Sequence, residues 1–408
     1  MIDDVKNWLS ENRNNFTLLG ICPIFPEIVK ASFELAAEKD FPPMFVATPR
    51  QIDGDRGYTG WSQEEFVNYC EKLSENKGFD GKYLIARDHG GPFQSMRDRG
   101  DPSISLEKAM EYAKQLFRAD VKAGFDIIHV DATEDPRIDG ILDLEEVAKR
   151  TTELIKATET YRKDEGFSKV YYEVGTEEIV GGMTDPGNFE KFIDLLKENL
   201  SSEVDNLYDK LIFVVGQVGT TMRIDMENDF DPGQAQKLVD IVSKRNLFLK
   251  VHYTDWLDNS TLKKFPEIGV GGANVGPEFA AALIEGLEEM ESKERKAVDT
   301  SQPSGGLSNF MEILGEESLK NAPWGKFVPP EIDEGNLESY SRKNKRDVAV
   351  CVGRYAMNES EVIQARERLY KNIEEYLALD EPDRVLIDSI KGSIARYVKS
   401  FNLKGSLS

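Results

Sequence analysis

The residues best suited to chemistry in this chain are its three histidines, His89, His129 and His252. Each lies at or near the end of a short apolar segment of the kind that forms a buried parallel strand. Neutral imidazoles together with carboxylates bind divalent metal ions, and a metal with an open position can polarise a substrate oxygen. We therefore expect a metal or substrate site where these strands end. His129, between Ile128 and Val130, could equally be a core residue bonded to the backbone.

Acidic and amide side chains that could complete such a site follow the same segments. Glu177 comes after Gly175-Thr176, past the expected end of a strand, and is well placed to turn inward. Glu173 lies in the middle of that strand and could instead be a structural residue of the core. Gln217 could act as a weak neutral ligand or bind a hydroxyl group. The other candidates are Asp88, Asp131, Glu178 and Asp255.

The elements that must position these residues alternate along the chain. Helical patterns, such as a capping box at Ser62-x-x-Glu65 and an apolar face over 106–123 that ends at Gly124, separate short apolar segments rich in β-forming residues. This alternation predicts a (β/α)8 TIM barrel, whose active site lies at the carboxyl ends of its strands. A doubly wound open sheet is the alternative, but it normally shows a Gly-rich turn after its first strand. The expected strands are 18–25, 44–49, 83–90, 126–133, 170–178, 211–219, 247–255 and 267–276.

The chain changes character after about residue 300. We expect a barrel domain over residues 1–300 and a helical C-terminal extension, residues 301–408, packed on it. The stretch 301–306 is rich in Ser, Pro and Gly and indicates a loop, whereas helical patterns occupy 308–320, 360–378 and 381–400. The basic run 341–346 is interpreted as a solvated charged stretch. Because the extension could form an oligomer surface, we expect a homo-oligomer.

The composition excludes several classes of protein. The 408 residues include 51 Lys and Arg against 74 Asp and Glu, which gives a net charge of −23. Such a charge repels phosphate backbones and anionic lipids, so we expect neither nucleic acid nor membrane as a partner. There is no long apolar run, the first residues do not resemble a signal peptide, and the three cysteines are far apart. We therefore expect a cytoplasmic protein without a disulfide framework.

A glycine-rich stretch, residues 271–277, closes the last expected strand before a helix. In barrels, the loops after strands seven and eight commonly hold phosphate on backbone amides at a helix N-terminus. We expect a phosphate near Gly271, Gly272 and Gly276, with Asn274 turned toward the reacting centre. The alternative is that the glycines only make a tight exit from the strand. Basic side chains that could assist are Arg50, Arg56 and Arg97.

Several motifs spread over residues 44–285 resemble one family when they are taken together and in order. The motifs are Tyr58-Thr59-Gly60, Asp88-His89-x-Gly-Pro, His129-Val130-Asp131-Ala132, Gly175-Thr176-Glu177, His252-x-Thr254-Asp255 and Val275-Gly276-Pro277. The set resembles the Z-type subunit family of tagatose-bisphosphate aldolase, which is similar to the class II aldolases. No single motif is specific, but the ordered set is.

The resemblance implies roles for individual residues. By similarity to the class II aldolases, Asp88 would be the acid or base, with Asp131 as the other possible proton carrier. His89, Glu177 and His252 would bind a divalent metal, with zinc expected first and manganese, magnesium or cobalt as alternatives. Asn274 would correspond to an asparagine that contacts the enediolate. The remaining positions expected to bind substrate are Tyr58, Thr59, Gln217, Asp255 and Arg97, besides the three glycines named above.

The chain lacks a histidine that the catalytic class II aldolases carry, and it also lacks the motifs of a kinase. Gln217 stands where catalytic class II aldolases carry a histidine, so the resemblance does not imply a three-histidine zinc site. Some members of the family carry the name of a tagatose-6-phosphate kinase. This sequence contains neither a phosphate-binding Gly-x-x-x-x-Gly-Lys loop nor a kinase catalytic-loop pattern, so a kinase is not expected.

The resemblance implies two activities and one alternative without activity. The leading expectation is a divalent-metal-dependent enzyme acting on a small phosphorylated ketose. It would be a 4-epimerase for fructose 6-phosphate and tagatose 6-phosphate, or an aldolase for tagatose 1,6-bisphosphate. Both reactions begin when a base removes the C4 hydroxyl proton and the C3–C4 bond breaks. The alternatives are a non-catalytic subunit that stabilises a separate class II aldolase in a hetero-complex, and a metal-free isomerase that uses carboxylates alone.

Overall fold

A closed barrel of eight parallel strands forms the centre of the computed structural model, which describes residues 5–176, 182–201, 206–298, 306–377 and 382–407. The strands pair in chain order, and the last returns to the first. The closed sheet confirms the predicted (β/α)8 barrel and excludes an open, doubly wound sheet. The strands are β1 (Leu18–Ile21), β2 (Met44–Ala47), β3 (Leu84–Gly90), β4 (Ile127–Val130), β5 (Tyr171–Gly175), β6 (Leu211–Val215), β7 (Phe248–Val251) and β8 (Gly272–Val275).

Helices cover the outside of the barrel and build the extension. Those of the barrel region are α1 (Val5–Glu11), α2 (Pro26–Lys39), α3 (Gln63–Asn76), α4 (Leu106–Ala123), α5 (Leu144–Asp164), α6 (Pro186–Ser201), α7 (Pro232–Ser243), α8 (Asn259–Ile268) and α9 (Pro277–Val298), with the 3₁₀ turn η1 (Leu207–Lys210). Those of the extension are α10 (Phe310–Asn321), α11 (Leu337–Lys343), α12 (Lys345–Val352), α13 (Ser360–Leu377) and α14 (Pro382–Ser400), with η2 (Trp324–Phe327), η3 (Glu334–Asn336) and η4 (Gly353–Tyr355). In the described ranges, no helix carries an apolar stretch long enough to cross a bilayer.

Local capping residues set several of these helix ends. Ser62 accepts a hydrogen bond from the backbone of Glu65, and the Glu65 carboxylate accepts one from the backbone of Ser62, so the predicted capping box begins α3. Gly124 ends α4 with a φ of 94°, a conformation that glycine adopts without the cost of a side chain. Both ends agree with the sequence prediction because each depends on a few neighbouring residues.

Strand β8 is shorter than the expected segment 267–276. The chain up to Ile268 instead belongs to α8, which ends at Gly269 with a φ of 95°. Gly271 and Gly272 therefore lie at the amino end of β8. The prediction that these two glycines stand at the carboxyl end, beside the site, is wrong because the helix takes up the residues that were expected to begin the strand.

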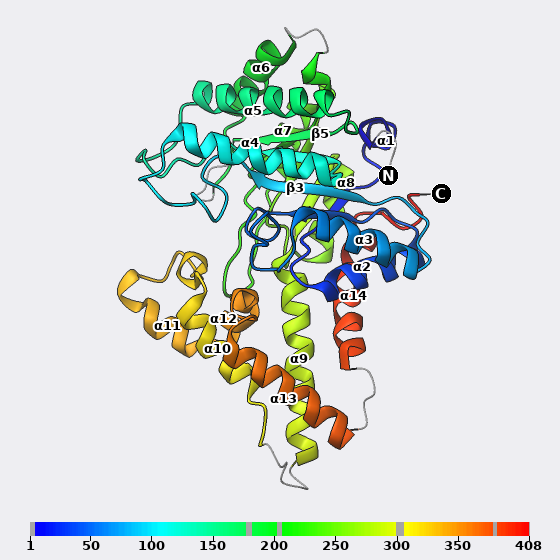
Figure 1. Cartoon of the computed structure of the whole chain (residues 1–408), viewed down its shortest axis with the longest axis vertical. Coiled ribbons are helices and arrows are strands. Elements are labelled where there is room, and N and C mark those ends of the chain that lie inside the picture. The colour runs from blue at the N-terminus through cyan, green and yellow to red at the C-terminus, as the bar shows by residue number, and fades with distance from the viewer. Residues whose placement is uncertain (1–4, 177–181, 202–205, 299–305, 378–381, 408) are drawn as a thin grey trace.

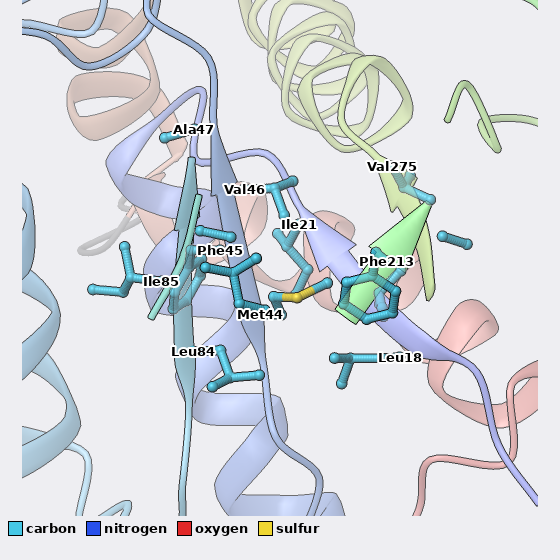
Figure 2. Packing of buried hydrophobic residues seen from close by; sticks show 14 of the residues in the cluster. Leu18, Ile21, Met44, Phe45, Val46, Ala47, Leu84, Ile85, Phe213 and Val275 are labelled. Atoms are coloured by element: carbon cyan, nitrogen blue, oxygen red, sulfur yellow. The ribbon is translucent and has the colours of Figure 1, made fainter. Parts of the chain in front are cut away.

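The core lies inside the barrel and between the strands and the surrounding helices. Every strand residue is buried except His89, which is half-buried. Figure 2 shows side chains of β1, β2 and β6, among them Ile21, Met44 and Phe213, gathered in one region of the barrel interior. Strands buried on both faces show continuous apolar runs, which explains why they could be found in the sequence.

The extension packs against one side of the barrel through α9 and α14 (Figure 1). Helix α9 is 22 residues long, and α10, α12 and α13 pack against it. Helix α14 then returns to the barrel, where the hydroxyl of Ser389 donates to the carbonyl of Ala282 at 2.9 Å. The predicted division between the two parts, at residue 300, lies outside the described residues.

The basic run 341–346 spans the junction of α11 and α12 on the surface. Arg342 pairs with Glu338 at 3.1 Å along its own helix, whereas Arg346 pairs with Glu288 of α9 at 2.7 Å. Both arginines are at least half exposed, so these pairs contribute little to stability on their own. The run helps to orient α12 beside α9 and does not reach the pocket described below.

Candidate active site at the carboxyl ends of the strands

A pocket of about 380 Å³ opens at the carboxyl ends of the barrel strands, where the site was expected. From the barrel it is lined by, among others, Asp88, His89, Asp131, His252 and Asn274. The extension closes another side with Pro323, Lys326, Phe327, Arg354 and Tyr355. The pocket therefore lies between two parts of the chain that are far apart in sequence.

Four buried side chains meet at the base of this pocket: Asp88 of β3 and His252, directly after β7, line it, and His129 of β4 and Glu173 of β5 lie next to them without lining it. One possible ligand atom from each lies within 4.8 Å of the others. Nε2 of His252 is 3.2 Å from Oε1 of Glu173 and 3.5 Å from Oδ1 of Asp88. Nδ1 of His129 is 3.5 Å and 3.6 Å from the same two oxygens. Sheet register explains part of this arrangement, because His129 and Glu173 are direct partners between β4 and β5.

His89 reaches the same place through an irregularity in β3. Its φ is 48°, and the pairing with β4 shifts register between Arg87 and Gly90. A bulge of this kind redirects a side chain that regular alternation would turn away, at a cost in backbone strain. The ring of His89 lies 4.9 Å from that of His252 and 5.2 Å from that of His129, measured between centroids. The structure thus brings the three histidines together.

A buried lysine balances part of the negative charge. Nζ of Lys250, on β7, lies 2.5 Å from Oε2 of Glu173, and both side chains are fully buried. Because Lys250 takes this oxygen, the other oxygen of Glu173 faces His129 and His252. Apart from the imidazoles, the two carboxylates and the ammonium carry a net charge of −1, which a divalent cation would outweigh.

The carboxylates of this group are ionised at neutral pH. Burial raises the pKa of both Asp88 and Glu173, but neighbouring positive groups outweigh it. For Asp88, the imidazoles of His252 and His89 hold the pKa well below its ordinary value. For Glu173, the ammonium of Lys250 is the strongest of these groups, and the pKa falls to about 2. Ionised carboxylates are the form that binds a metal or accepts a proton.

Asp131 holds His89 in place. Its Oδ2 lies 2.9 Å from Nδ1 of His89 and accepts a hydrogen bond from Gln94 at 2.8 Å. Its Oδ1 accepts hydrogen bonds from the hydroxyl and the backbone of Thr133. Burial raises the pKa of Asp131, but these contacts bring it below its ordinary value. Asp131 therefore acts on the site through His89, as the carboxylate partner that fixes an imidazole ring.

Asn274, on β8, contacts Asp88 directly. Its amide nitrogen donates to Oδ1 of Asp88 at 3.2 Å. The paired residue on β1 is Gly20, and a side chain there would collide with the Asn274 amide, since an added Cβ would lie 2.2 Å from its oxygen. Glycine at this position therefore makes room for the asparagine. The geometry places Asn274 beside the group in which the sequence expected the chemistry.

Asp255 occupies the amides at the start of α9. Its Oδ1 accepts hydrogen bonds from the backbone of Gly276 at 3.0 Å and of Glu278 at 2.8 Å. Burial raises the pKa of Asp255 to about 7, although these two bonds favour its charged form. The expected phosphate site at this helix start is therefore filled by a carboxylate of the chain itself.

The remaining predicted residues divide between the pocket and its surroundings. Tyr58, Gln217, Asp255 and Gly276 line the pocket. Thr59 and Arg97 do not, because the Thr59 hydroxyl donates to the carbonyl of Gln51 and Arg97 extends toward Asp53, 3.6 Å away. Gly271 and Gly272 lie at the other end of β8, and Glu177 and Glu178 lie outside the described residues.

Sequence reasoning left some residues of the site undecided and missed others. His129 and Glu173 were open between a structural and a functional role, and Lys250, Arg354 and Tyr355 were not considered. A charged residue inside an apolar strand, as in Tyr172-Glu173-Val174 and Leu249-Lys250-Val251, was the available signal, since such a charge must find a partner. No comparable signal marks Arg354, which lies in a three-residue turn.

The group at the base of the pocket suits a divalent metal ion. Zinc, manganese and cobalt bind a set of two imidazoles and two carboxylates. Magnesium prefers oxygen ligands, so this set suits it less well. Nε2 of His129 is buried and has no hydrogen-bond partner in the described part of the chain. Nδ1 of the same ring, which faces Asp88 and Glu173, accepts a hydrogen bond from the backbone N–H of His89 at 3.1 Å. An unsatisfied buried nitrogen in this ring is consistent with a site built for a ligand.

Solved structures share this fold. The chain matches a probable tagatose 6 phosphate kinase from Sinorhizobium meliloti with a TM-score of 0.74 and 19% identity, over 94% of this chain and 100% of that one. It matches a fructose-bisphosphate aldolase from Campylobacter jejuni with a TM-score of 0.58 and 12% identity, over 98% and 93% of the two chains. At these identities the likeness concerns the fold alone.

Comparison of sequences identifies relatives that align with nearly the whole chain. A D-tagatose 6-phosphate 4-epimerase from Agrobacterium fabrum is 26% identical over 421 aligned positions, which cover 93% of each chain. The D-tagatose-1,6-bisphosphate aldolase subunit GatZ from Salmonella choleraesuis is 25% identical over 379, covering 87% of this chain and 84% of that protein. The sequence model for a family described as D-tagatose-1,6-bisphosphate aldolase subunit GatZ/KbaZ-like matches residues 5–393. The resemblance seen in the motifs is thereby confirmed, and the chain belongs to the GatZ/KbaZ-like family.

Proposed function

We propose that this protein is a divalent-metal-dependent enzyme that interconverts fructose 6-phosphate and tagatose 6-phosphate by 4-epimerisation. The observation that carries the proposal is the buried group Asp88, His129, Glu173 and His252 at the base of a pocket. Removing two carboxylates and an ammonium from water is costly, and a chain that only stabilised a partner would gain nothing from doing so at a pocket. The relative from Agrobacterium fabrum, a 4-epimerase aligned over 93% of both chains, supports the same activity.

The residues that would hold the metal come from the three histidines and the carboxylates around them. His252 belongs both to the ligands implied by the resemblance and to the buried group. Glu173 offers one oxygen while Lys250 binds the other, and His129 and His89 are the further imidazole candidates. When bound, a divalent cation there supplies Lewis-acid polarisation of the ketose carbonyl and its neighbouring hydroxyl.

Asp88 is the residue to which we assign proton transfer. Its carboxylate lines the pocket, is ionised, and has the Asn274 amide on one oxygen. Taking the proton of the C4 hydroxyl starts cleavage of the C3–C4 bond. If the aldehyde turns over, so that C3 attacks the opposite face of its carbonyl carbon, C4 is inverted, and return of the proton to the C4 oxygen yields the 4-epimer. Asp131 is already engaged by His89, Gln94 and Thr133, which leaves it less free for this step.

Release of the aldehyde in place of its return would make the protein an aldolase for tagatose 1,6-bisphosphate. The same residues serve both outcomes, because the two reactions share the bond-breaking step. The name of the Salmonella choleraesuis relative, an aldolase subunit, favours a further candidate in which the chain assists a separate class II aldolase. An enzyme of either kind would convert its substrate without a partner, whereas a stabilising subunit would not.

The deciding experiment uses the purified full chain without any partner. Fructose 6-phosphate and, separately, tagatose 1,6-bisphosphate are incubated with protein that has been loaded with zinc, manganese, magnesium or cobalt, and with protein treated with EDTA. Formation of tagatose 6-phosphate that EDTA abolishes is expected. Production of triose phosphates from the bisphosphate identifies an aldolase. A chain that is inactive with every metal, yet prolongs the active life of a class II aldolase, is the stabilising subunit.

A further inference from the structure

One guanidinium in the wall of the pocket is buried without a negative partner. Arg354, in η4 of the extension, is 5% exposed and lines the pocket. One of its nitrogens donates to the carbonyl of Cys351, and the other lies 3.3 Å from the hydroxyl of Tyr355 and 3.7 Å from the sulfur of Met222. No carboxylate in the described ranges lies within ion-pair distance of it. A buried charge without a counter-ion is unfavourable, so its retention at a pocket indicates an anionic ligand.

Further cations line the same wall. Arg50, in the loop after β2, has no side-chain ion pair among the described residues, and its guanidinium lies 5.0 Å from the centre of the Tyr355 ring. Arg354 lies 4.5 Å from the centre of that ring. Lys326 also lines the pocket, as does Arg99, whose nearest acid, Glu134, is 3.5 Å away. In a chain of net charge −23, this concentration of cations at one side of a pocket is a local exception.

The positive charges of this wall change the pKa of the Tyr355 hydroxyl. Burial raises the pKa of Tyr355, but the charges of Arg354 and Arg50 outweigh burial and bring the pKa below its ordinary value. Tyr58 packs edge to face against Tyr355, at 5.5 Å between ring centroids, and lines the pocket beside it. The wall therefore presents guanidinium groups together with phenol hydroxyls, which are the donors that a phosphate group accepts.

The backbone amides at the start of α9, which could bind an anion, are already used. The amides of Gly276 and Glu278 donate to Asp255, and Asp255 itself makes no ion pair with Arg354. On the opposite side, the base of the pocket carries Asp88 and Glu173, which would repel an anion unless a cation is bound. The pocket thus has a positive wall from the extension and a negative base from the barrel.

We propose that Arg354 and Arg50 form the subsite for the phosphate group of a phosphorylated ketose, so that the extension and the loop after β2, and not the β8–α9 turn, bind the anion. The sugar end would then extend toward Asp88 and His252. That the anion belongs to a ketose phosphate rests on the proposed function. The anion site itself rests only on the buried, unpaired guanidinium and its neighbours. The chemical class of ligand is a phosphomonoester with a short polyol chain.

The first test measures binding of inorganic phosphate, fructose 6-phosphate and fructose by titration calorimetry to the full chain. Samples are compared with and without EDTA, because a metal at the base could itself bind phosphate. The variants are Arg354→Gln and Arg50→Gln, with Arg342→Gln as the matched control that removes the same charge from an exposed, distant site in the extension. Loss of one charge-assisted pair should weaken binding of phosphate and of fructose 6-phosphate about 10- to 100-fold. Fructose binding should not change.

The outcomes separate the subsite from the activity. Phosphate binding that is equal in wild type and Arg354→Gln overturns the proposal, whatever the enzyme does. Phosphate binding that depends on Arg354, in a chain that converts no ketose phosphate, supports the subsite and contradicts the proposed function. Arg354→Gln could fail to fold, which its thermal midpoint shows by comparison with Arg342→Gln. In that case the affinity of Arg50→Gln for phosphate decides, because Arg50 is only half-buried. A tenfold loss in Arg50→Gln supports the subsite, and an unchanged affinity overturns it.

Discussion

Buried charge is balanced at the base of the pocket but not in the wall formed by Arg354, Arg50 and Tyr355. At the base, each carboxylate has positive or hydrogen-bonding neighbours, with Lys250 at 2.5 Å from Glu173 and two imidazoles within 3.6 Å of Asp88. In the wall, the guanidinium of Arg354 is also buried, but among the described residues it hydrogen-bonds to neutral groups and makes no ion pair. The base is thus a nearly balanced network that a cation would complete, whereas the wall carries a charge that only an anion would balance.

This difference suggests how one small pocket could orient a ligand with two unlike ends. A cation at the base attracts oxygens of a carbonyl and a hydroxyl, and the wall attracts a phosphate. A reversed ligand would leave the guanidinium of Arg354 without its anion, which disfavours that orientation. The following predictions, ordered by expected size, test whether base and wall have these separate tasks.

The largest effect is expected from Asp88→Asn. If Asp88 transfers the proton, turnover should fall about 10²- to 10⁴-fold, because an amide cannot accept it. The thermal midpoint should stay near wild type, since Asn preserves the shape and the contact with Asn274. Initial rates with fructose 6-phosphate measure the change, with Asp139→Asn on an exposed loop as control. A rate within threefold of wild type, roughly 0.65 kcal/mol of barrier, would transfer the role to Asp131.

Lys250→Met tests whether the charges at the base depend on one another. Removing the ammonium leaves Glu173 buried and unpaired, so the free energy of unfolding should fall by about 3–5 kcal/mol in EDTA. The double variant Lys250→Met/Glu173→Gln should recover much of that loss, because no ion is left without its partner. Urea unfolding gives both values. A loss below about 1 kcal/mol in the single variant would contradict the network.

Metal content distinguishes between the possible ligands. His252→Ala should weaken binding of the divalent cation by more than about 100-fold, since even indirect contacts to a metal are worth 10- to 100-fold. Equilibrium dialysis followed by elemental analysis measures this in His252→Ala, His129→Ala and His89→Ala. A loss in His129→Ala but not in His89→Ala assigns the site to the buried group. The opposite result assigns it to the ligands implied by the sequence motifs, and unchanged metal in His252→Ala contradicts both.

The smallest effect concerns Asp255, which lies between base and wall. Its folded pKa is about 7, above the ordinary value near 4, so between these pH values the folded chain holds a proton that the unfolded chain has released. Its contribution to stability is therefore complete below about pH 4 and falls as the pH rises to about 7. Asp255→Asn cannot titrate, and relative to wild type it should gain on the order of 2 kcal/mol over this range.

Thermal or urea unfolding at pH 5 and pH 8 measures this gain. The charge of Arg354 lowers the pKa of Asp255. In Arg354→Gln this pKa should be higher, so the stability of the variant should keep falling up to a higher pH than that of wild type. A difference between Asp255→Asn and wild type that is the same at both pH values would mean that Asp255 is ionised throughout. The charge of Arg354 and the amides of Gly276 and Glu278 would then outweigh the effect of burial on Asp255.

The sequence by itself determined the barrel and the place of its chemistry. Strands buried on both faces are continuous apolar runs, and helices between them have local start and stop signals, such as Ser62 and Gly124. The carboxyl ends of parallel strands meet at one end of a barrel, so histidines that follow such runs must gather there. This explains why three histidines could be placed together without any structure.

Only the tertiary structure decided which groups face one another. Register pairs His129 with Glu173, a bulge turns His89 into the pocket beside Asp88, and the end of α8 moves Gly271 and Gly272 to the far end of β8. A register or a bulge depends on hydrogen bonds between strands that are distant in sequence, so local patterns do not reveal it.

The wall is the part that the sequence could predict least. The backbone carbonyl of Tyr58 accepts a hydrogen bond from Asn358, 300 positions away, and Arg354 comes from a three-residue turn with no periodic pattern. A basic residue in a turn is ordinarily solvated, and nothing in its neighbours distinguishes a buried guanidinium from an exposed one. Burial and the absence of a counter-ion are properties of the packed surroundings, which here come from the barrel loops and the extension together.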